Sequence, residues 1–376
     1  MNSTWIASDN IISPLGSTTE ENYRALRQGK SGISLTSYRG IKEELYLGKI
    51  TDGLTDDERY SSFTRFERLA IQSTEEALKK TTLDPKSTRT IFILSTTKGN
   101  IELLEQGKEE DQRIHLHEAA KTITRFFGNT NIPVVVSSAC ISGVMAMLTG
   151  KYLIESGQYD HAVIIGADVL SYFVISGFQS LQALSPGICK PFDKNRKGIN
   201  LGEAAATVVL TSDPLSIGVQ KNIRITGGGL SNDANHISGP SRTGEELNTA
   251  IQKAMNESGI NEGAIDFISA HGTATIYNDE MEARAFHLAG MDQKPLHSLK
   301  GYFGHTLGAA GILESIVSIH ALKNNELLPS SGYEESGVSQ PVNVIQRLEQ
   351  QEITTCLKTA SGFGGCNAAM ILKKEI

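Results

Sequence analysis

Short apolar runs rich in β-branched residues alternate along the chain with longer segments of helical periodicity. Runs typical of buried strands lie at residues 5–12, 90–94, 134–136, 161–167, 204–210, 223–229, 265–268, 356–360 and 367–372. Residues 64–80 show amphipathic helical spacing, with Phe66, Leu69 and Ala77 among the apolar positions. Strands that alternate with helices predict an α/β protein with mixed or parallel sheets covered by helices.

The predicted order of strands and helices occurs twice, and the repetition breaks near residues 215–225. We therefore expect two halves, residues 1–222 and 223–376. No internal sequence repeat accompanies this order, so the duplication is inferred from the order of elements alone. In the second half, small and apolar residues from Gly304 to Leu322 predict a central, buried helix. Residues 101–127 predict one or two surface helices.

Composition restricts the class of protein. The 376 residues are enough to bury a large core, and their hydrophobic content of 39% is that of an ordinary globular protein. A formal net charge of −7 argues against nucleic acid or an anionic membrane as the main partner. No apolar run approaches the ~20 residues of a membrane span, and the first residues lack the basic start of a signal peptide.

The four cysteines, Cys140, Cys189, Cys356 and Cys366, show no paired spacing. This pattern predicts reduced thiols in a cytoplasmic protein, with neither a disulfide framework nor a zinc site. Cys140 differs from the others because it lies between the strand at 134–136 and an apolar helix. A thiol at a helix N-terminus is expected to favour the thiolate. Taken alone, this stretch slightly favours a buried structural cysteine, as most free cysteines are.

A histidine follows the predicted strand at 265–268. His271 is succeeded by Gly272, Thr273 and Thr275, and the carboxyl ends of strands are where open α/β sheets bind ligands. A histidine in this position is more often structural than catalytic, and the two threonines could equally cap a helix or form a turn.

Three more stretches carry candidate chemistry. Lys300 and His305 stand at the start of the predicted buried helix, and Glu314 on that helix needs a cationic partner when it is buried. The glycines of residues 362–365 permit positive φ angles and leave backbone N–H groups free to bind an oxyanion. Residues 190–198 form a loop with several basic side chains, which is most often only a solvated surface.

Each of these features has an ordinary structural explanation, and taken singly each is functional in roughly one case in four or fewer. Together they form a set of one cysteine, two histidines, a lysine and an oxyanion loop. A purely structural explanation of the whole set is improbable.

The chain resembles the β-ketoacyl synthases, the condensing enzymes of fatty acid and polyketide synthesis. Residues 138–143 match the nucleophile motif, and residues 271–282 match the first histidine motif. Residues 300–311 match the lysine and second histidine motif, and Phe363 lies in the Gly-Phe-Gly-Gly turn before the last strand. The resemblance runs from the first strand to the C-terminus, and the ordered set Cys, His, Lys, His is very specific. It implies a thiolase-like fold with a duplicated five-layer αβαβα architecture.

The resemblance implies a two-step reaction. An acyl chain would move from acyl carrier protein to Cys140, and malonyl-carrier protein would then lose its carboxyl group and condense with that chain to give a 3-oxoacyl product. His271 and His305 would stabilise the enolate, Lys300 would orient and tune them, and Glu314 would hold Lys300.

Further positions take supporting roles by the same resemblance. Thr273 and Thr275 would bind the phosphopantetheine arm. Phe363 would act as a movable gate, and its backbone N–H, with that of Cys140, would bind the thioester oxygen. The resemblance implies no metal, redox or nucleotide cofactor, since the phosphopantetheine arrives on the carrier protein.

The main expected partner is acyl carrier protein. Because carrier proteins in such systems are acidic, we expect Lys194, Arg196 and Lys197 to form the docking patch, with Arg65 and Arg68 as secondary candidates. The strand at 134–137 and the helix after it correspond to the family's two-fold interface. They predict a homodimer, or a heterodimer with a chain-length partner that lacks the cysteine.

Several positions depart from the family pattern. The segment between Gly99 and Val134 is shorter than in housekeeping elongation enzymes, Ile199 replaces an aromatic residue, residues 204–206 replace a glycine-rich run, and Phe303 replaces a smaller residue. These changes leave the catalytic set intact and point to a specialised pathway, such as a polyene or another polyketide-like product.

Two other functions compete with this one. The first is a thiolase or an initiating or chalcone-type synthase. Initiating and chalcone-type synthases use a Cys, His and Asn set, and the second histidine motif at His305 argues against them. A chain-length-factor subunit would bind a true synthase without catalysis of its own. Such subunits typically lack the nucleophile, whereas Cys140 is present.

Overall fold

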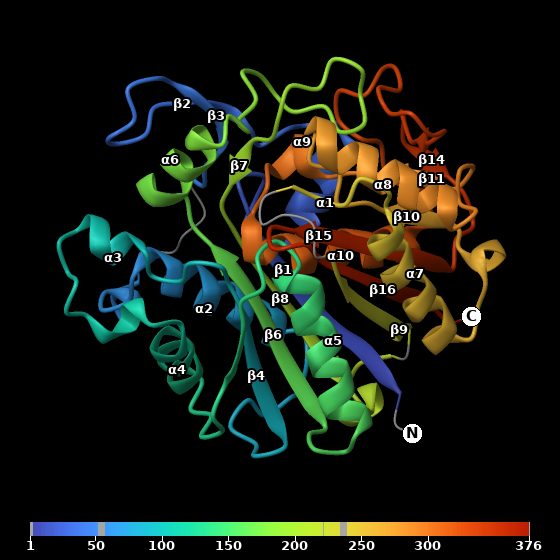
Figure 1. Ribbon diagram of the computed structural model, residues 1–376. Helices are drawn as coiled ribbons and strands as arrows, with labels where there is room; N and C mark the ends of the chain where they lie inside the picture. Colours follow the sequence, from blue (N-terminus) through green and yellow to red (C-terminus); the bar gives the residue numbers. More distant parts are fainter. Residues whose placement is uncertain (1–2, 52–56, 221, 234–238, 376) are drawn as a thin grey trace.

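The computed structural model describes residues 3–51, 57–220, 222–233 and 239–375. The strands of its main sheet are β1 (Thr4–Ile12), β4 (Thr90–Ser95), β5 (Val134–Val136), β6 (His161–Asp168), β8 (Ala204–Thr211), β9 (Ile223–Asn232), β10 (Phe267–Ser269), β11 (Pro295–His297), β13 (Asn343–Val344), β15 (Thr355–Gly362) and β16 (Cys366–Lys374). Within the described residues these eleven strands form one mixed sheet, in the order β13-β11-β10-β15-β16-β9-β1-β8-β6-β4-β5 (Figure 1).

Both halves of the chain build their part of this sheet in the same way. In the first half, β8 pairs antiparallel with β1 and β6, and β4 and β5 continue parallel beyond β6. In the second half, β16 pairs antiparallel with β9 and β15, and β10 and β11 continue parallel beyond β15. The two parts meet where β1 and β9 pair through Thr4 with Ile225 and Trp5 with Arg224. The second half begins with β9, close to residue 221, which lies outside the described residues.

The helices cover and separate these two half-sheets. They are α1 (Thr19–Arg27), α2 (Arg65–Leu78), α3 (Glu102–Glu105), α4 (Leu116–Phe126), α5 (Ser142–Glu155), α6 (Tyr172–Ser180), α7 (Glu245–Ser258), α8 (Ile276–Leu288), α9 (Lys300–Phe303) and α10 (Ala310–Asn324). Short 3-10 helices are η1 (Glu58–Tyr60), η2 (Gln112–Ile114), η3 (Pro214–Ile217), η4 (Glu262–Ala264) and η5 (Leu307–Ala309). Small sheets pair β2 (Ser34–Thr36), β3 (Leu45–Gly48) and β7 (Leu201–Gly202), and separately β12 (Glu326–Leu327) and β14 (Glu349–Gln350).

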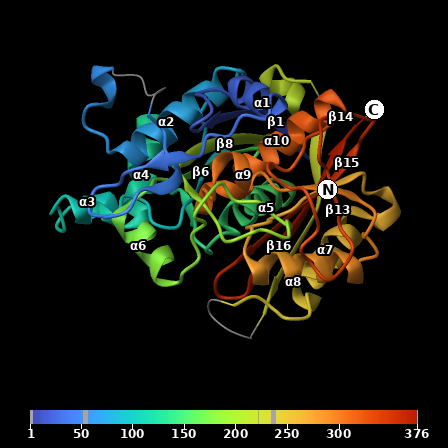
Figure 2. The ribbon, with the colours of Figure 1, turned by 90° about the horizontal axis from the view of Figure 1, so that it is seen from above.

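Contacts between these elements define five layers. Helix α2 packs on β1, β6 and β8 and contacts α4, whereas α7 packs on β9 and β16 and contacts α8. Helices α5 and α10 touch strands of both half-sheets and each other, so they form the middle layer (Figure 2). The largest apolar cluster includes residues of both middle helices and of strands on either side. The predicted thiolase-like αβαβα fold is therefore confirmed.

The two middle helices approach each other at glycines. A Cβ atom on Gly143 of α5 would lie 2.7 Å from the backbone nitrogen of Ile312, and one on Gly311 of α10 would lie 2.5 Å from that of Val144. Real Cβ atoms cannot come so close to backbone, so only glycine permits this crossing. The crossing lies at the N-terminal ends of α5 and α10 and brings together the residues that precede both helices.

Local sequence explains where several helices begin. Thr18 and Thr64 cap α1 and α2, and each forms a capping box with the glutamate three residues later. The expectation of one helix from Gly304 to Leu322 is wrong in its first turns. Gly304 adopts a φ of +71° and ends α9, and the chain then passes through η5 before α10 begins at Ala310. Residues 101–127 form α3, η2 and α4.

None of the helices in the described part of the chain combines the length and the apolar character that crossing a membrane requires.

Candidate active site

Cys140 lies between β5 and α5, two residues before the first residue of the helix. The preceding residue, Ala139, has a φ of +44°, which is rare for a residue with a side chain. The Ser142 hydroxyl stabilises this tight passage, because it donates to the Ala139 carbonyl oxygen and accepts from the Ser138 N–H. The turn directs the sulfur towards the second half of the molecule, where the Cys140 side chain remains 9% exposed.

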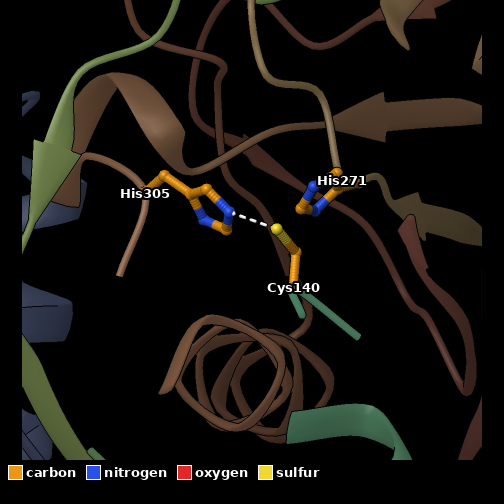
Figure 3. Close-up of side chains that lie close together, drawn as sticks. All are labelled: Cys140, His271 and His305. Carbon is orange, nitrogen blue, oxygen red and sulfur yellow. Dashed lines mark hydrogen bonds between the residues drawn. The ribbon is translucent and has the colours of Figure 1, made fainter. Parts of the chain in front are cut away.

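Two imidazoles meet the sulfur of Cys140 (Figure 3). His305 Nε2 lies 2.9 Å from Cys140 Sγ, within hydrogen-bond distance. His271, which follows β10, packs edge-on against His305 with ring centroids 5.2 Å apart. One atom from each of the three side chains lies within 4.8 Å of the other two. The structure thus brings together three predicted site residues that are far apart in the sequence.

A sulfur and two imidazole nitrogens this close could also surround a metal ion. In a tetrahedral zinc site the ligand nitrogen and sulfur would be about 3.5 Å apart, given Zn–N near 2.0 Å and Zn–S near 2.3 Å. The 2.9 Å between His305 Nε2 and Cys140 Sγ is shorter and fits a hydrogen bond. The geometry therefore favours proton exchange between these two groups over shared metal binding.

Burial controls the protonation of this trio. It raises the pKa of the Cys140 thiol to about 11, although the Lys300 ammonium and the Phe363 backbone N–H lower it. Burial also holds the pKa of His271 and His305 well below the usual range, with Lys300 adding to the effect. The expectation that the helix N-terminus favours a resting thiolate is therefore wrong, because desolvation outweighs it. A neutral His305 beside a thiol is suited to accept the Cys140 proton when a substrate arrives.

A buried ionic network lies behind the histidines. Lys300 donates to one oxygen of Glu314, as predicted, and the other Glu314 oxygen lies 2.6 Å from Lys358 Nζ. Burial alone would raise the pKa of Glu314, but the two ammonium groups together lower it. The sequence-based reasoning missed Lys358, although a lysine inside the apolar run 356–360 was a signal for a buried charge.

The loop after β10 is held by two buried carboxylates. Glu282 accepts from the backbone N–H groups of His271 and Gly272 at 2.8 and 2.6 Å. Asp279 accepts from the N–H groups of Thr273 and Ala274. These bonds fix the backbone that carries His271.

Thr273 and Thr275 lie on the same loop with their hydroxyl oxygens 2.8 Å apart, and both side chains line a cavity. This cavity of about 450 Å³ also reaches Cys140, His271 and His305. The predicted pantetheine-binding threonines and the predicted catalytic trio therefore face one space.

The loop 362–365 borders the same cavity. A Cβ atom on Gly362 would lie 3.0 Å from the Cys140 backbone nitrogen, so this loop passes close to the nucleophile. Phe363, 39% exposed, packs its ring against Phe178 at a centroid distance of 5.8 Å. Its position, partly free at the cavity wall, is compatible with the predicted gate.

The predicted docking residues are not alike. Lys194 and Lys197 are exposed, and Lys197 lines the cavity. Arg196 is buried, and its guanidinium donates to the carbonyl oxygens of Asp193 and Gly337. The expectation that Arg196 forms part of a surface patch is wrong, because its charge is used inside the protein, 3.8 Å from Asp279.

The secondary docking candidates and one missed residue complete the site. Arg65 is half-buried and pairs with Glu203 at 2.7 Å, and Arg68 is half-buried. Asp168 at the end of β6 was not foreseen. It accepts from the backbone N–H groups of Thr97 and Gly308 and so ties the loop after β4 to the segment that follows His305.

Comparison with known proteins agrees with this geometry. Residues 5–214 match the family described as "Beta-ketoacyl synthase, N-terminal domain", and residues 223–334 match "Beta-ketoacyl synthase, C-terminal domain". The chain is 27% identical over 408 residues to the 3-oxoacyl-[acyl-carrier-protein] synthase 2 of Vibrio cholerae, which covers 97% of each protein.

Solved structures show the same relationship. A beta-ketoacyl synthase from Burkholderia phymatum superimposes with a TM-score of 0.91 and 25% identity over the whole of both chains. A ketosynthase from Xenorhabdus doucetiae, solved in complex with its chain length factor, gives a TM-score of 0.88 and 26% identity over 100% of this chain and 98% of that one. Since the match extends over both halves and includes the residues that converge on the cavity, this chain belongs to the beta-ketoacyl synthase family and is an acyltransferase.

Proposed function

We propose that this protein catalyses a decarboxylative Claisen condensation between an acyl group carried on Cys140 and a malonyl group delivered by acyl carrier protein. The product is a 3-oxoacyl thioester on the carrier protein. The observation that carries the proposal is the 2.9 Å contact between Cys140 Sγ and His305 Nε2, with His271 on the same cavity.

The first half-reaction loads the enzyme. His305 Nε2 accepts the thiol proton as the Cys140 sulfur attacks the thioester carbonyl carbon, and the backbone N–H groups of Cys140 and Phe363 stabilise the oxyanion. The bond between the acyl carbon and the carrier sulfur then breaks. The proton held by His305 passes to the departing carrier thiolate, so the imidazole returns to its neutral form.

The second half-reaction builds the carbon–carbon bond. The malonyl thioester loses its carboxyl group, and the electrons of the broken C–C bond form an enolate. N–H groups of the neutral His271 and His305 imidazoles stabilise the developing charge in a site shielded from water, with the His305 proton on Nε2 in this step and not on Nδ1 as during loading. The enolate carbon attacks the acyl carbonyl carbon, and the bond between that carbon and the Cys140 sulfur breaks. The leaving thiolate takes up a proton from water, because the loss of carbon dioxide from the malonyl carboxylate consumes one proton overall.

The chemistry asks for no resident cofactor in this proposal, because decarboxylation supplies the electrons of the new bond. Thr273 and Thr275 bind the phosphopantetheine arm, and Phe363 opens or closes the path between the acyl and malonyl positions. The support is their place on the wall of the cavity that reaches Cys140.

Acyl carrier protein is the proposed substrate carrier, and Lys197 with Lys194 is the proposed docking patch. Both side chains are exposed and Lys197 lines the cavity, whereas the buried Arg196 holds Asp279. Lys197→Glu should raise the KM for the carrier-bound substrate and leave turnover of a small thioester mimic unchanged. The control is Lys86→Glu, because Lys86 is an exposed lysine that precedes the first residue of β4. An equal loss on both substrates would contradict the docking role.

The assembly proposed here is a dimer in which β5, one of the two edge strands of the main sheet, contributes to the interface. The partner is a second copy or a chain-length-factor-like chain, as in the related ketosynthase of Xenorhabdus doucetiae. We place the protein in a specialised fatty acid or polyketide pathway, on the sequence departures at Ile199, residues 204–206 and Phe303.

Mass spectrometry of Cys140 after incubation with a panel of acyl-carrier proteins tests the proposal and identifies the acyl group. Loading of Cys140 and release of carbon dioxide from malonyl-carrier protein are the expected results. An unmodified Cys140 together with no decarboxylation, in protein that is folded, would instead indicate a subunit that binds a synthase without catalysis.

A further inference from the structure

Lys358 is a fully buried lysine that the proposed reaction does not use. It stands in the middle of β15, and its ammonium group is enclosed by three oxygens. Lys358 Nζ donates to the carbonyl oxygens of Thr359 at 2.8 Å and Ser269 at 3.2 Å, and it pairs with Glu314 Oε2 at 2.6 Å. The ammonium group therefore has three partners and no exposure to solvent.

Two consecutive residues of β15 hold the strand end that carries His271. Strand β10 pairs with β15 in parallel, with Ser269 opposite Lys358, and His271 follows two residues after Ser269. The next residue of β15, Thr359, donates its hydroxyl to Glu282, which accepts the backbone N–H of His271. The position of the imidazole thus depends on bonds made from β15.

Lys358 and Lys300 each pair with one oxygen of Glu314, so two ammonium groups share one buried carboxylate. Packing alone does not explain a lysine here. Removing an ammonium group from water has a large free-energy cost that pairing often only offsets, and an apolar side chain of similar volume is often as stable or more so. Methionine would fill the same space without that cost.

We propose that Lys358 is a positioning residue of the active site, a fixed cation that anchors the end of β10 that carries His271 and, with Lys300, adds to the effect of burial that keeps both catalytic imidazoles neutral. This role concerns the same active site and rests on the proposed condensation. Neutral imidazoles are required there to accept the Cys140 proton. Burial, Lys300 and Lys358 all lower the pKa of His271 and of His305.

The surroundings of the imidazoles limit which other groups could produce this effect. Within the described residues, the charged and titratable side chains that face the trio or its network are Cys140, Asp279, Glu282, Lys300, Glu314 and Lys358, with the thiols of Cys189 and Cys356, with His297 on the neighbouring strand β11, and with Lys98 and Asp168 acting on the thiol of Cys140. Among these, Lys300 and Lys358 are the two cations that act on both histidines.

Two substitutions and one control test the proposal. Lys358→Ala leaves a hole lined by two carbonyl oxygens and a carboxylate, and Lys358→Met keeps the length of the side chain but removes its charge. The control is Lys151→Met, since Lys151 is also buried and pairs with Glu155 and Glu257, away from the cavity. The measurements are malonyl decarboxylation and the rate of iodoacetamide labelling of Cys140, each as a function of pH and corrected for the folded fraction.

We expect both Lys358 variants to lower kcat by about tenfold or more while KM changes little. Removal of the cation raises the imidazole pKa values, so the acid limb of the pH profile should move to higher pH by about one unit. Methylammonium should restore part of the activity of Lys358→Ala, because it can occupy the oxygen-lined hole, and should leave the wild type unaffected. Lys151→Met should lose stability without any shift of the pH profile.

A folded Lys358 variant with the wild-type pH profile, or a loss that methylammonium does not restore in Lys358→Ala, would overturn the proposal. If Lys358→Ala does not fold, the pH profile of Lys358→Met tests the proposal. If neither variant folds, the result contradicts the proposal, because it would show that the role of Lys358 is to stabilise the fold. If the wild type does not decarboxylate malonyl-carrier protein, the proposed function fails by itself, and the pH dependence of Cys140 labelling still tests Lys358.

Discussion

The two halves of the molecule place different chemistry at equivalent points of the same topology. In the first half the chain leaves β5 and passes Cys140 before it enters α5, and in the second it leaves β11 and passes Lys300 and His305 before it enters α10. The first half therefore contributes the proposed nucleophile, Cys140, at the position where the second contributes its proposed proton acceptor, His305. The crossing of α5 and α10 at Gly143 and Gly311 makes these two positions meet.

Close to the converging side chains, the halves differ most in their buried charges, although the first half buries other ionic groups elsewhere, such as Glu67 and Glu203. Around Cys140, the first half has one fully buried carboxylate, Asp168, which accepts bonds from neutral N–H and hydroxyl donors. The second half surrounds its histidines with a set of buried ionic groups, namely Asp279, Glu282, Lys300, Glu314 and Lys358. In the proposed reaction, this difference means that the nucleophile needs geometry, whereas the imidazoles need both geometry and a controlled electrostatic field. We therefore predict that a substitution in the first half can abolish the chemistry and leave the free energy of unfolding nearly unchanged. A substitution among the buried charges of the second half should lower both.

Removal of the sulfur should give the largest effect on chemistry. Cys140→Ala should abolish acyl loading, by at least about three orders of magnitude, and yet change the free energy of unfolding by about 1 kcal/mol or less. Intact-protein mass spectrometry and urea unfolding measure the two quantities. The parallel change in the second half, Lys300→Met, should lower both, because Glu314 loses one of its two cations. Cys140→Ala that unfolds readily would contradict the separation.

The largest effect on stability is expected from the shared carboxylate. Glu314→Gln leaves two buried ammonium groups without a counter-charge and should cost about 3–5 kcal/mol. The matched change in the first half, Asp168→Asn, replaces an acceptor of neutral donors and should cost about 1–3 kcal/mol. Free energies of unfolding from urea titrations at pH 7 compare them. Equal losses would show that the two halves do not differ in the way proposed here.

The same contrast explains what sequence could predict. The predictions of Cys140 and His271 depended on local signals, since each follows an apolar strand and is accompanied by small residues, and that of His305 depended on its place at the start of an apolar helix rich in small residues. The structure confirms that these three side chains converge. The α/β alternation and the repeated order of elements could also be predicted, because the periodicity of strands and helices is visible within a few residues of sequence.

The burial of the charged side chains could not be predicted in the same way. Lys358 meets Ser269, 89 residues away, only because β10 and β15 pair in one register. Arg196 was predicted to lie in a surface docking patch, and its burial depends on the Gly337 carbonyl, 141 residues further along the chain. Helix α10 was placed too early because small residues around Gly304 suit a helix, whereas the positive φ of that glycine breaks it. Such features depend on long-range packing, which no local pattern reports.

The helix crossing offers a test of how the halves are brought together. Gly311→Ala places a methyl group against the backbone of Val144 and should cost about 1–3 kcal/mol, with a parallel fall in Cys140 labelling as the sulfur and His305 move apart. Gly177→Ala in α6, where no atom lies within 4 Å of the new Cβ, should be neutral or stabilising by up to about 1 kcal/mol. Thermal unfolding and labelling rates measure both variants. A tolerant Gly311 would mean that the crossing does not set the site geometry.

The smallest effect concerns an ionic contact between the halves. Asp9 of β1 accepts from His320 of α10 at 3.1 Å, and Lys323 of α10 lies 3.9 Å away. Burial alone would raise the pKa of Asp9, but His320, with Lys323 and Lys80, lowers it far below its usual range. Since the folded pKa lies below the unfolded value near 3.9, the stabilisation is present above about pH 4 and disappears as pH falls through the folded pKa.

Asp9→Asn should therefore cost about 1–2 kcal/mol at pH 7, and its stability should approach that of the wild type as the pH is lowered below 4. The control is Asp160→Asn, because the Arg89–Asp160 pair is exposed and should contribute at most about 1 kcal/mol. Free energies of unfolding from urea titrations between pH 2 and 7 compare the two variants with the wild type. A pH-independent loss in Asp9→Asn would show that packing, and not the charge of Asp9, joins β1 to α10; the electrostatic difference between the halves would then stop at the active site.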